Sequence, residues 1–290
     1  KFTFMTWDSA KAIREKVTAG TKVLIIGAGL IGLKCAEALH HLNADITVVD
    51  LADRILPSIL DVRAGKIMQK HIEDKGTKFI LGTSVEQFSR NSAKLTNGDT
   101  VDFDILVVAV GVRPNTELVS DAGGKVEKGI ITDLHQQTTI DNVYAAGDCT
   151  VSHDCSSNTD RILALLPNAF MQGEVAGKNM AGEETLYLNA IPMNAIGFYG
   201  LHIITAGSYD GDEDITEDAD KEIYKKLVFK DGLLKGFILM GDVARAGIYT
   251  SMIKEQIPLT EVDLDLLREK PQMMMFGKAR REEKLAGKKH

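Results

Sequence analysis

The first part of the chain consists of short apolar runs separated by segments with helical spacing. Val23–Ile26, Ile46–Val49 and Ile105–Val110 are continuous runs rich in β-branched residues, which is typical of strands covered on both faces. Leu33–Leu42 and Ile59–Lys75 instead place apolar residues at the spacing of an amphipathic helix. Strands that alternate with helices predict an α/β domain with a parallel sheet.

Other segments predict antiparallel structure and further helices. A strand and a hairpin arm are expected in the first part, with the turn at Asn97-Gly98-Asp99. The predicted strands are Lys78–Leu81, Ser84–Ser89, Ala93–Leu95, Thr100–Phe103, Ile130–Thr132, Val143–Ala146, Ile223–Phe229 and Gly236–Met240. The remaining predicted helices are Asp8–Lys16, with Asp8 as its N-cap, Ala169–Ala181 and Val243–Ile257. We expect Thr150–Asp160 and the acidic stretch Asp210–Asp220 to be solvated loops, and Lys278–Lys289 to be a solvated basic tail or a partner contact.

The clearest candidate site is the glycine pattern between the first predicted strand and its helix. Gly27, Gly29 and Gly32 follow G-x-G-x-x-G spacing, and Asp50 ends the next strand 18 residues later. Gly27 permits a tight turn, Gly29 lets a pyrophosphate approach the backbone, and Gly32 lets the helix pack closely on the strand. The N–H groups at the helix start, at Leu30 and Ile31, face the phosphates, and Asp50 accepts hydrogen bonds from a ribose. The alternative is a glycine-rich turn that binds nothing.

Three downstream motifs resemble one family. Leu106–Asn115 reads LVVAVGVRPN, Asn142–Cys149 reads NVYAAGDC, and Leu166–Gly173 reads LPNAFMQG. With the glycine loop, in this order, the chain resembles the FAD-dependent pyridine nucleotide–disulfide oxidoreductase superfamily. Its nearest groups are NADH oxidases, rubredoxin reductases and nitrite reductase flavoproteins. The resemblance implies FAD and NAD as cofactors and hydride transfer from NADH to the flavin.

The resemblance also implies site residues. Asp148, after Gly147, takes the role of the aspartate that binds the ribityl chain of FAD. The helix start at Pro167, Asn168 and Ala169 faces the flavin, and Gly111 lies where the chain leaves the NAD domain. No catalytic side chain is assigned, and the scattered histidines predict no metal site.

The implied architecture is a Rossmann-like NAD domain inserted in an incomplete FAD domain, followed by an α+β interface domain. We expect the NAD domain with its lead-in at residues 1–112, the returning FAD half at 113–184 and the interface domain at 185–290. The family's first FAD-binding glycine motif precedes the NAD domain, and here the NAD strand already begins near residue 22. We therefore expect the chain to lack the N-terminal half of the FAD domain.

Lys34 departs from the family pattern. Relatives commonly read Gly-Leu-Glu where this chain reads Gly32-Leu33-Lys34, and that glutamate helps to place the nicotinamide amide. One interpretation is an exposed helix lysine, with the nicotinamide held by backbone groups. The other is an altered nicotinamide pocket, or a cation that interacts with the flavin edge. The sequence leaves both open.

Composition restricts the partners. The formal net charge of −7 gives no support for a nucleic-acid partner, and no 18-residue apolar run predicts a membrane span. Three cysteines, Cys35, Cys149 and Cys155, are too few for a disulfide framework, and we expect none of them to be a redox centre. The absence of a recognisable secretory signal predicts a cytoplasmic protein.

The resulting prediction is a flavoprotein oxidoreductase that passes electrons from NADH through FAD to an unidentified acceptor. A small redox protein of the rubredoxin or ferredoxin type is one candidate acceptor, and a homodimer or a subunit of a complex is expected. Asp50 favours NADH over NADPH because a 2′-phosphate would meet a like charge, which Arg54 would moderate. The alternatives are a diaphorase-like electron-transfer subunit of a larger complex and a non-catalytic nucleotide-binding fragment.

Overall fold

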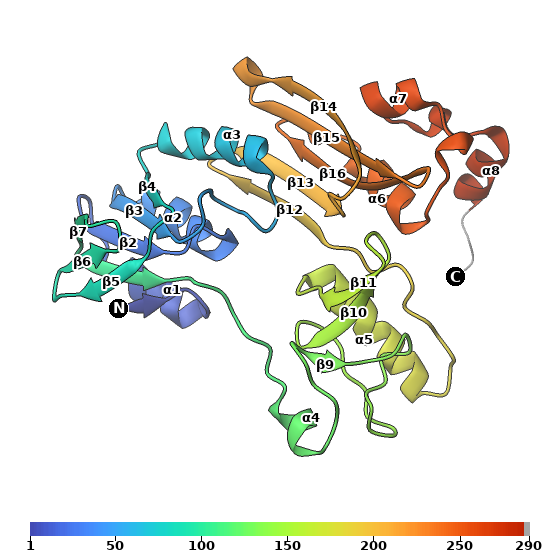
Figure 1. The fold of residues 1–290 in the computed structure, drawn as a ribbon, viewed down its shortest axis with the longest axis horizontal. Helices are drawn as coiled ribbons and strands as arrows, with labels where there is room; N and C mark the ends of the chain where they lie inside the picture. The colour runs from blue at the N-terminus through green and yellow to red at the C-terminus, as the bar shows by residue number, and fades with distance from the viewer. Residues whose placement is uncertain (287–290) are drawn as a thin grey trace. The chain divides into compact units, whose positions relative to one another are not determined.

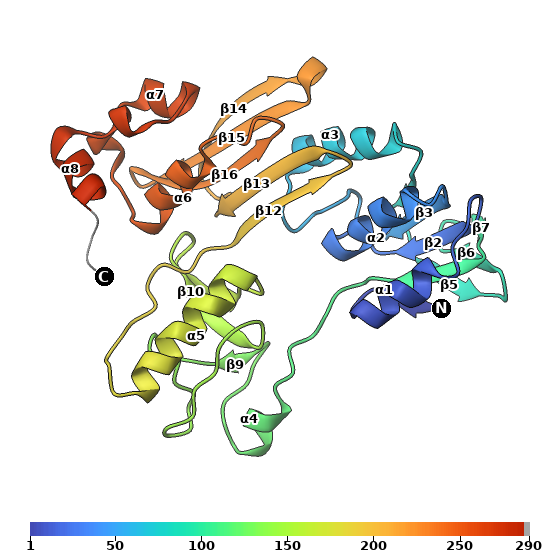
Figure 2. The same cartoon turned by 180° about the vertical axis from the view of Figure 1, so that it is seen from behind.

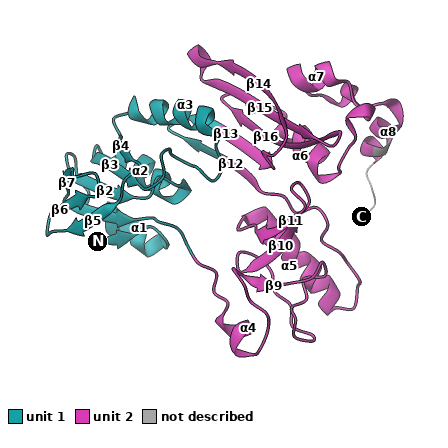
Figure 3. Cartoon of the chain, viewed as in Figure 1, with its two compact units in different colours: residues 1–112, 196–202 teal, residues 113–195, 203–290 magenta. Residues whose placement is uncertain are grey.

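The computed structural model describes residues 1–286, which form two compact units. Unit 1 comprises residues 1–112 and 196–202, and unit 2 comprises residues 113–195 and 203–290 (Figure 3). The first unit boundary falls where the predicted NAD domain ends. The predicted separation of 113–184 from 185–290 stays a prediction, because both segments belong mainly to unit 2.

Unit 1 contains a five-stranded parallel sheet in the order β1-β8-β2-β3-β4 (Figure 1). The strands are β1 (Phe2–Thr3), β2 (Lys22–Ile26), β3 (Asp45–Asp50), β4 (Lys78–Leu81) and β8 (Ile105–Val108). Leu24, Ile25, Val48 and Val49 are fully buried, as the continuous apolar runs predicted. The α/β fold class with a parallel sheet is therefore confirmed.

The helices of unit 1 are α1 (Trp7–Arg14), α2 (Leu30–His40) and α3 (Val62–Glu73). The N-cap of α1 is Thr6 and not Asp8. The Thr6 side chain accepts a hydrogen bond from the Ser9 backbone N–H, and the Ser9 side chain accepts one from the Thr6 backbone N–H. Helix α2 begins three residues before the predicted Leu33, directly at the glycine loop. Helix α3 begins at Val62, three residues after the predicted Ile59, and its N-cap is Asp61.

A three-stranded antiparallel sheet completes unit 1. It has the order β5-β6-β7, with β5 (Val85–Phe88), β6 (Ser92–Leu95) and β7 (Thr100–Asp102). Its inward residues Ala93 and Leu95 pack in one cluster with Leu24 and Val49 of the parallel sheet. The predicted hairpin arm is present, and its apolar face belongs to the core of the same unit.

The first segment of unit 2 differs from the prediction. It contains α4 (Glu117–Asp121), the sheet β11-β10-β9, and α5 (Leu166–Met180) (Figure 2). The strands are β9 (Ile130–Ile131), β10 (Thr150–Asp154) and β11 (Thr159–Ile162). The predicted strand Val143–Ala146 is absent and forms a single bridge, between Tyr144 and Gln137. An apolar run becomes a strand only where a neighbouring strand satisfies its backbone groups.

The predicted loop at residues 150–160 is instead the hairpin of β10 and β11. Thr150, Ser152 and Asp154 alternate along β10 and are nearly or fully buried. Polar composition suggested an exposed loop, but polar side chains can be buried where they are hydrogen-bonded. Asp154 Oδ1, for example, accepts a hydrogen bond from the Ser156 backbone N–H.

A five-stranded antiparallel sheet follows, in the order β12-β13-β16-β15-β14. The strands are β12 (Met193–Phe198), β13 (Leu201–Gly207), β14 (Asp212–Asp218), β15 (Ile223–Lys230) and β16 (Leu233–Met240). The predicted hairpin of 223–240 is confirmed. The acidic stretch is not a loop: it forms the edge strand β14, paired with β15 along its whole length.

The C-terminal helices are α6 (Ala246–Lys254), which packs on β16, α7 (Leu264–Glu269) and α8 (Lys278–Ala286). Short 3-10 turns occupy 219–221, 259–261 and 273–275. Phe237, Tyr249 and Met252 are buried in the core that α6 forms with the sheet. The predicted basic tail is therefore helical as far as Ala286, and its last residues lie outside the described part of the chain.

Candidate functional site

The glycine loop between β2 and α2 has the geometry of a phosphate-binding turn. Gly27 has a φ of +113°, and a Cβ there would lie 2.3 Å from the Ala109 carbonyl oxygen. A Cβ on Gly32 would lie 1.9 Å from the Gly27 carbonyl oxygen. Neither position can therefore hold a side chain without displacing the backbone.

Gly29 is different, because nothing lies within 4 Å of the position where its Cβ would be. It is the N-cap of α2 and makes no side-chain capping hydrogen bond. The first helical turn includes Leu30 and Ile31. Its N–H groups therefore lie beside open space that no side chain fills. This combination fits an anion such as a pyrophosphate at the helix start.

Asp50 ties this loop to the end of β3. Its Oδ2 accepts a hydrogen bond from the Ala28 backbone at 2.6 Å, and its Oδ1 accepts one from the Ala52 backbone at 2.8 Å. The carboxylate therefore fixes the loop as well as offering its remaining lone pairs to a ribose. Sequence reasoning assigned only the second role, because the contact with Ala28 depends on the fold.

Arg54 lies four residues beyond Asp50, and its Nη1 is 3.0 Å from Asp53 Oδ1. Its Nε is buried and has no hydrogen-bond partner. Gly111, the last predicted residue in this unit, is exposed with a φ of +108° and follows β8, the strand whose end packs against Gly27. The structure thus gathers the predicted nucleotide residues of unit 1 around the ends of β2, β3 and β8.

In unit 2 the structure brings two predicted motifs together. A Cβ on Gly147 would lie 3.5 Å from the Cβ of Ala169, in the first turn of α5. Pro167 lies in that turn, and the N-cap Leu165 makes no side-chain capping hydrogen bond. Asp148, next to Gly147, is exposed. An exposed carboxylate and an uncapped helix start therefore lie close together.

Gln172 holds the Gly147 turn in place and was missed by sequence reasoning. It is 1% exposed, and its Oε1 accepts a hydrogen bond from the Gly147 backbone at 2.6 Å. Its Nε2 donates to Ser152 Oγ, which links α5 to β10. The signal in the sequence was slight: a glutamine six residues into a helix is usually an exposed residue.

Asn168 has a structural role for its side chain. It is fully buried, its Nδ2 donates to the Ile191 carbonyl oxygen at 3.0 Å, and its Oδ1 accepts from Tyr187 Oη at 2.8 Å. Only its backbone remains to serve a ligand. The predicted site residue therefore stays a candidate through its N–H group alone.

The three cysteines are unpaired. Burial raises the pKa of the Cys35 thiol to about 12. Burial, and then the charge of Asp154, also raise the pKa of Cys155. Cys149 is half-buried, and its Sγ lies 3.5 Å from the Ala146 carbonyl oxygen. The thiols of Cys35 and Cys155 are thus held in the unreactive protonated form.

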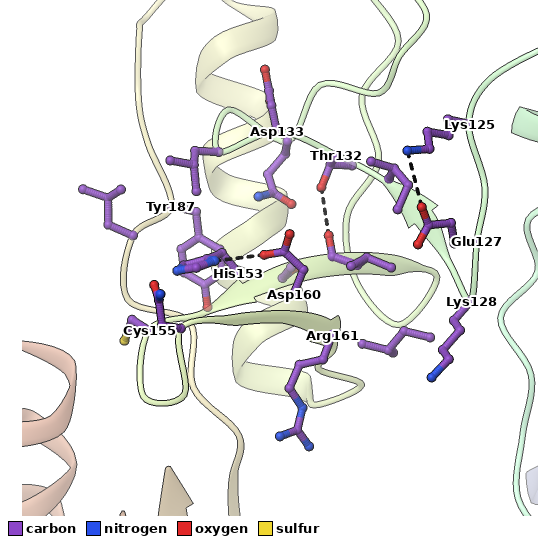
Figure 4. A pocket seen from close by; sticks show the side chains of 18 of the residues that line it. Lys125, Glu127, Lys128, Thr132, Asp133, His153, Cys155, Asp160, Arg161 and Tyr187 are labelled. Atoms are coloured by element: carbon purple, nitrogen blue, oxygen red, sulfur yellow. Dashed lines mark hydrogen bonds and ion pairs between the residues drawn. The ribbon is translucent and has the colours of Figure 1, made fainter. Parts of the chain in front are cut away.

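Unit 2 also contains a cavity that none of the predicted residues line. Its volume is about 1030 Å³, and Figure 4 shows charged side chains around it on β10, β11 and the segment near β9. His153 is paired with Asp160 at 2.9 Å, and Lys125 with Glu127 at 3.4 Å. Acidic and basic side chains thus lie side by side around the cavity, which therefore has a mixed polar lining.

Two kinds of feature are absent from residues 1–286. No helix there is both long and apolar enough to cross a membrane. No group of three or more His, Cys, Asp or Glu side chains there is arranged to hold a metal ion.

Comparison with known proteins gives two family matches. Residues 1–173 match the family model described as pyridine nucleotide-disulphide oxidoreductase, and residues 192–257 match the rubredoxin NAD+ reductase C-terminal domain. The first match covers more than half of the chain.

Individual relatives extend the comparison. The chain is 32% identical over 266 residues to an NADH-dependent phenylglyoxylate dehydrogenase subunit epsilon of Aromatoleum evansii, covering 88% of this chain and 63% of that protein. It is 30% identical over 267 residues to a rubredoxin-NAD(+) reductase of Acinetobacter baylyi, covering 89% and 64%. A solved NAD-dependent persulfide reductase from A. fulgidus has a TM-score of 0.80 at 26% identity, covering 90% and 54%. The chain thus spans less than two thirds of these proteins.

Proposed function

The chain belongs to the pyridine nucleotide-disulphide oxidoreductase family, and from this premise we propose that it carries the NADH site and the flavin-facing residues of an NADH-dependent flavoenzyme. The family uses FAD and NAD(H) and consists of oxidoreductases. The observation that carries the proposal is the open backbone at Gly29, at the start of α2, beside a loop fixed by Asp50.

In this proposal, backbone groups and one side chain bind and orient the nucleotide. The backbone of the α2 start holds the pyrophosphate, and the Asp50 carboxylate accepts the adenosine ribose hydroxyls. FAD, when bound, supplies the hydride acceptor. Asp148 fits its ribityl chain, because a carboxylate accepts hydrogen bonds from hydroxyl groups. The uncapped start of α5 fits its electron-rich ring edge, because a helix N-terminus favours negative charge.

Titration of NADH against Gly29→Ala tests the nucleotide site. The Gly29 backbone has a φ that alanine adopts without strain, so the fold should survive, but the methyl group occupies the space beside the helix start. We expect the dissociation constant for NADH to rise at least about tenfold. Gly173→Ala is the matched control, since that glycine on α5 is equally free of neighbours. Equal NADH affinity in both variants would refute the site.

The acceptor is proposed from the C-terminal region. Residues 192–257 match the C-terminal domain of rubredoxin NAD+ reductases, which favours a small redox protein of the rubredoxin or ferredoxin type as the acceptor. Flavin-loaded protein should reduce rubredoxin with NADH faster than it reduces dioxygen. Dioxygen consumption that exceeds rubredoxin reduction would contradict this assignment.

A second candidate is an electron-transfer subunit of a larger complex. The observation that favours it is the 32% identity to a dehydrogenase subunit over 88% of the chain. Sedimentation of the native protein distinguishes the two, because a subunit sediments with other polypeptides whereas a self-contained enzyme sediments alone or as a homodimer. A protein that binds NADH but never retains FAD would support instead a non-catalytic nucleotide-binding fragment.

A further inference from the structure

Unit 1 contains a hairpin tip that is held by side chains of two helices. The tip consists of residues 197–200, which are the last two residues of β12 and the two-residue turn before β13. Unit 1 includes this tip although it is far in sequence from the rest of the unit. Its two central residues, Tyr199 and Gly200, have φ values of +51° and +91°, which is the backbone pattern of a tight hairpin turn. The tip is therefore a rigid projection with its own polar backbone groups to satisfy.

Helix α2 satisfies those groups with an ion pair. Lys34 Nζ donates to the Gly197 carbonyl oxygen at 2.5 Å and to Glu37 Oε2 at 2.6 Å. Glu37 Oε1 accepts the Tyr199 backbone N–H at 2.6 Å. The Lys34 ammonium also lies 5.0 Å from the centre of the Phe198 ring, which is fully buried.

The Tyr199 side chain makes further contacts within unit 1. Together with the contacts of Lys34 and Glu37, these form what we call the Tyr199 socket. Its hydroxyl is 3.1 Å from Thr77 Oγ1, and its ring meets His40 edge-on at 5.2 Å between ring centres. His71 on α3 lies with Nε2 at 3.2 Å from the Tyr199 carbonyl oxygen, so this nitrogen must carry the proton. The tip thus has partners on α2, on α3 and just before β4.

The contacts of the Lys34 ammonium account for a lysine at this position. A lysine ammonium has three N–H donors, and here a carboxylate and a carbonyl take two while the third direction is bounded by the aromatic ring. We propose that Lys34 is a positioning residue: with Glu37 it fixes the hairpin tip 197–200 on α2, and it makes no contact with the nicotinamide of NADH. The second half of this proposal rests on the proposed NADH site at the start of α2.

Charge reversal at this position should release the tip. Lys34→Glu would place two carboxylates three residues apart on α2, beside the Gly197 carbonyl oxygen and the electron-rich face of Phe198. Every partner that now attracts residue 34 would then repel it. The Tyr199 amide is the reporter, because its N–H is protected only while Glu37 accepts it.

Hydrogen exchange and nucleotide titration on the full chain together test the proposal. In Lys34→Met the Tyr199 amide should exchange at least about tenfold faster, and in Lys34→Glu faster still. Lys34→Arg, which keeps the charge and the donors, should restore protection. Lys70→Met is the control, since it removes an exposed ion pair from α3. Unchanged exchange in Lys34→Met would overturn the positioning role.

The nucleotide arm separates this proposal from the proposed NADH site. Lys34→Met should change the dissociation constants for NADH and for ADP-ribose by no more than about twofold, since neither ligand touches residue 34. Loss of NADH affinity with ADP-ribose affinity retained would show a nicotinamide contact and refute the second half. If Gly29→Ala fails to weaken NADH binding while Lys34→Met still releases the tip, the NADH site is wrong and the positioning role stands.

Discussion

Two glycine turns that were predicted to bind cofactors, at Gly27 in unit 1 and at Gly147 in unit 2, follow similar apolar runs but have different surroundings. Gly27 follows β2, which pairs with β3 on one side and β8 on the other. Gly147 follows Val143–Ala146, whose only ladder contact is the bridge between Tyr144 and Gln137. The first turn is fixed by neighbouring backbone and by the Asp50 carboxylate, whereas the second is fixed mainly by the Gln172 side chain.

Both turns have exposed apolar residues beside them: Leu51, after β3, is 72% exposed and Val110, after β8, is 70% exposed. The strands beside the first turn have fully buried residues, such as Ile25 and Val48. In the helix beside the second turn, Leu166 is 84% exposed and Phe170 is 73% exposed. The two turns differ in the sheet beside them: the glycine loop follows a strand of a five-stranded sheet, and Gly147 leads into a three-stranded one.

The largest expected effect tests the rigid turn. Gly32→Ala places a methyl group 1.9 Å from the Gly27 carbonyl oxygen, so α2 must move away from the sheet. We expect the free energy of unfolding to fall by about 3 kcal/mol, measured by urea denaturation. Gly29→Ala is the control and should leave stability nearly unchanged. Equal stability of Gly32→Ala and Gly29→Ala would show that both positions tolerate a side chain equally well.

The second prediction tests the turn held by a side chain. Gln172→Leu leaves the Gly147 N–H and the Ser152 hydroxyl without their buried partner. We expect a loss of about 2 kcal/mol in stability, together with faster hydrogen exchange at Gly147. Gln69→Leu removes an exposed glutamine bonded to Glu73 and serves as the control. Unchanged exchange at Gly147 would mean that the backbone alone fixes this turn.

The third prediction concerns flavin retention. Asp148→Ala removes an exposed carboxylate beside the start of α5, and we expect flavin affinity in a complete enzyme to fall by about 1.5–3 kcal/mol. Affinity for NAD should stay nearly unchanged, since the glycine loop is a separate structure. Flavin content after gel filtration is the measurement, and full occupancy in the variant would count against the assignment.

The fourth prediction sharpens the role of Asp50. Asp50→Ser should narrow the preference for NADH over NADPH by about 1 kcal/mol, because the repulsion of a 2′-phosphate is lost. The same change removes acceptors for the Ala28 and Ala52 N–H groups, so stability should fall as well. Competitive titration of both nucleotides is the measurement, and tighter NADPH binding by the unaltered chain would contradict the expected preference.

The smallest effect is expected for the cysteines. Replacing all three by serine or alanine should leave NADH-to-dye electron transfer within a few-fold of the parent. At pH 8 a thiol with a pKa of about 12, as in Cys35, is ionised to only about one part in ten thousand. Thiol labelling should therefore reach Cys149 first. Loss of turnover in a folded, flavin-loaded Cys149→Ser or Cys155→Ser variant would make this loop the active site.

The sequence predicted what depends on local geometry. The glycine loop, β2, β3, β4 and the hairpin of β15 and β16 were all readable from spacing, because each needs particular residues at fixed offsets. The sequence pattern did not predict the strands β10 and β14, which are formed by polar or acidic residues. It also missed the Tyr199 socket, because Glu37, His71 and Thr77 are separated from the tip by more than a hundred residues.

The acidic strand β14 has a consequence for how copies of this chain meet. It lies at the edge of the five-stranded sheet, where an unpaired row of backbone groups is a template for another strand. Asp212, Asp214 and Asp218 follow this edge, and Lys221 lowers the pKa of Asp218 through a hydrogen bond. Arg268 pairs with Asp214 and Lys221 pairs with Asp218, so this edge presents charged side chains of both signs, which oppose the pairing of one exposed edge strand with another.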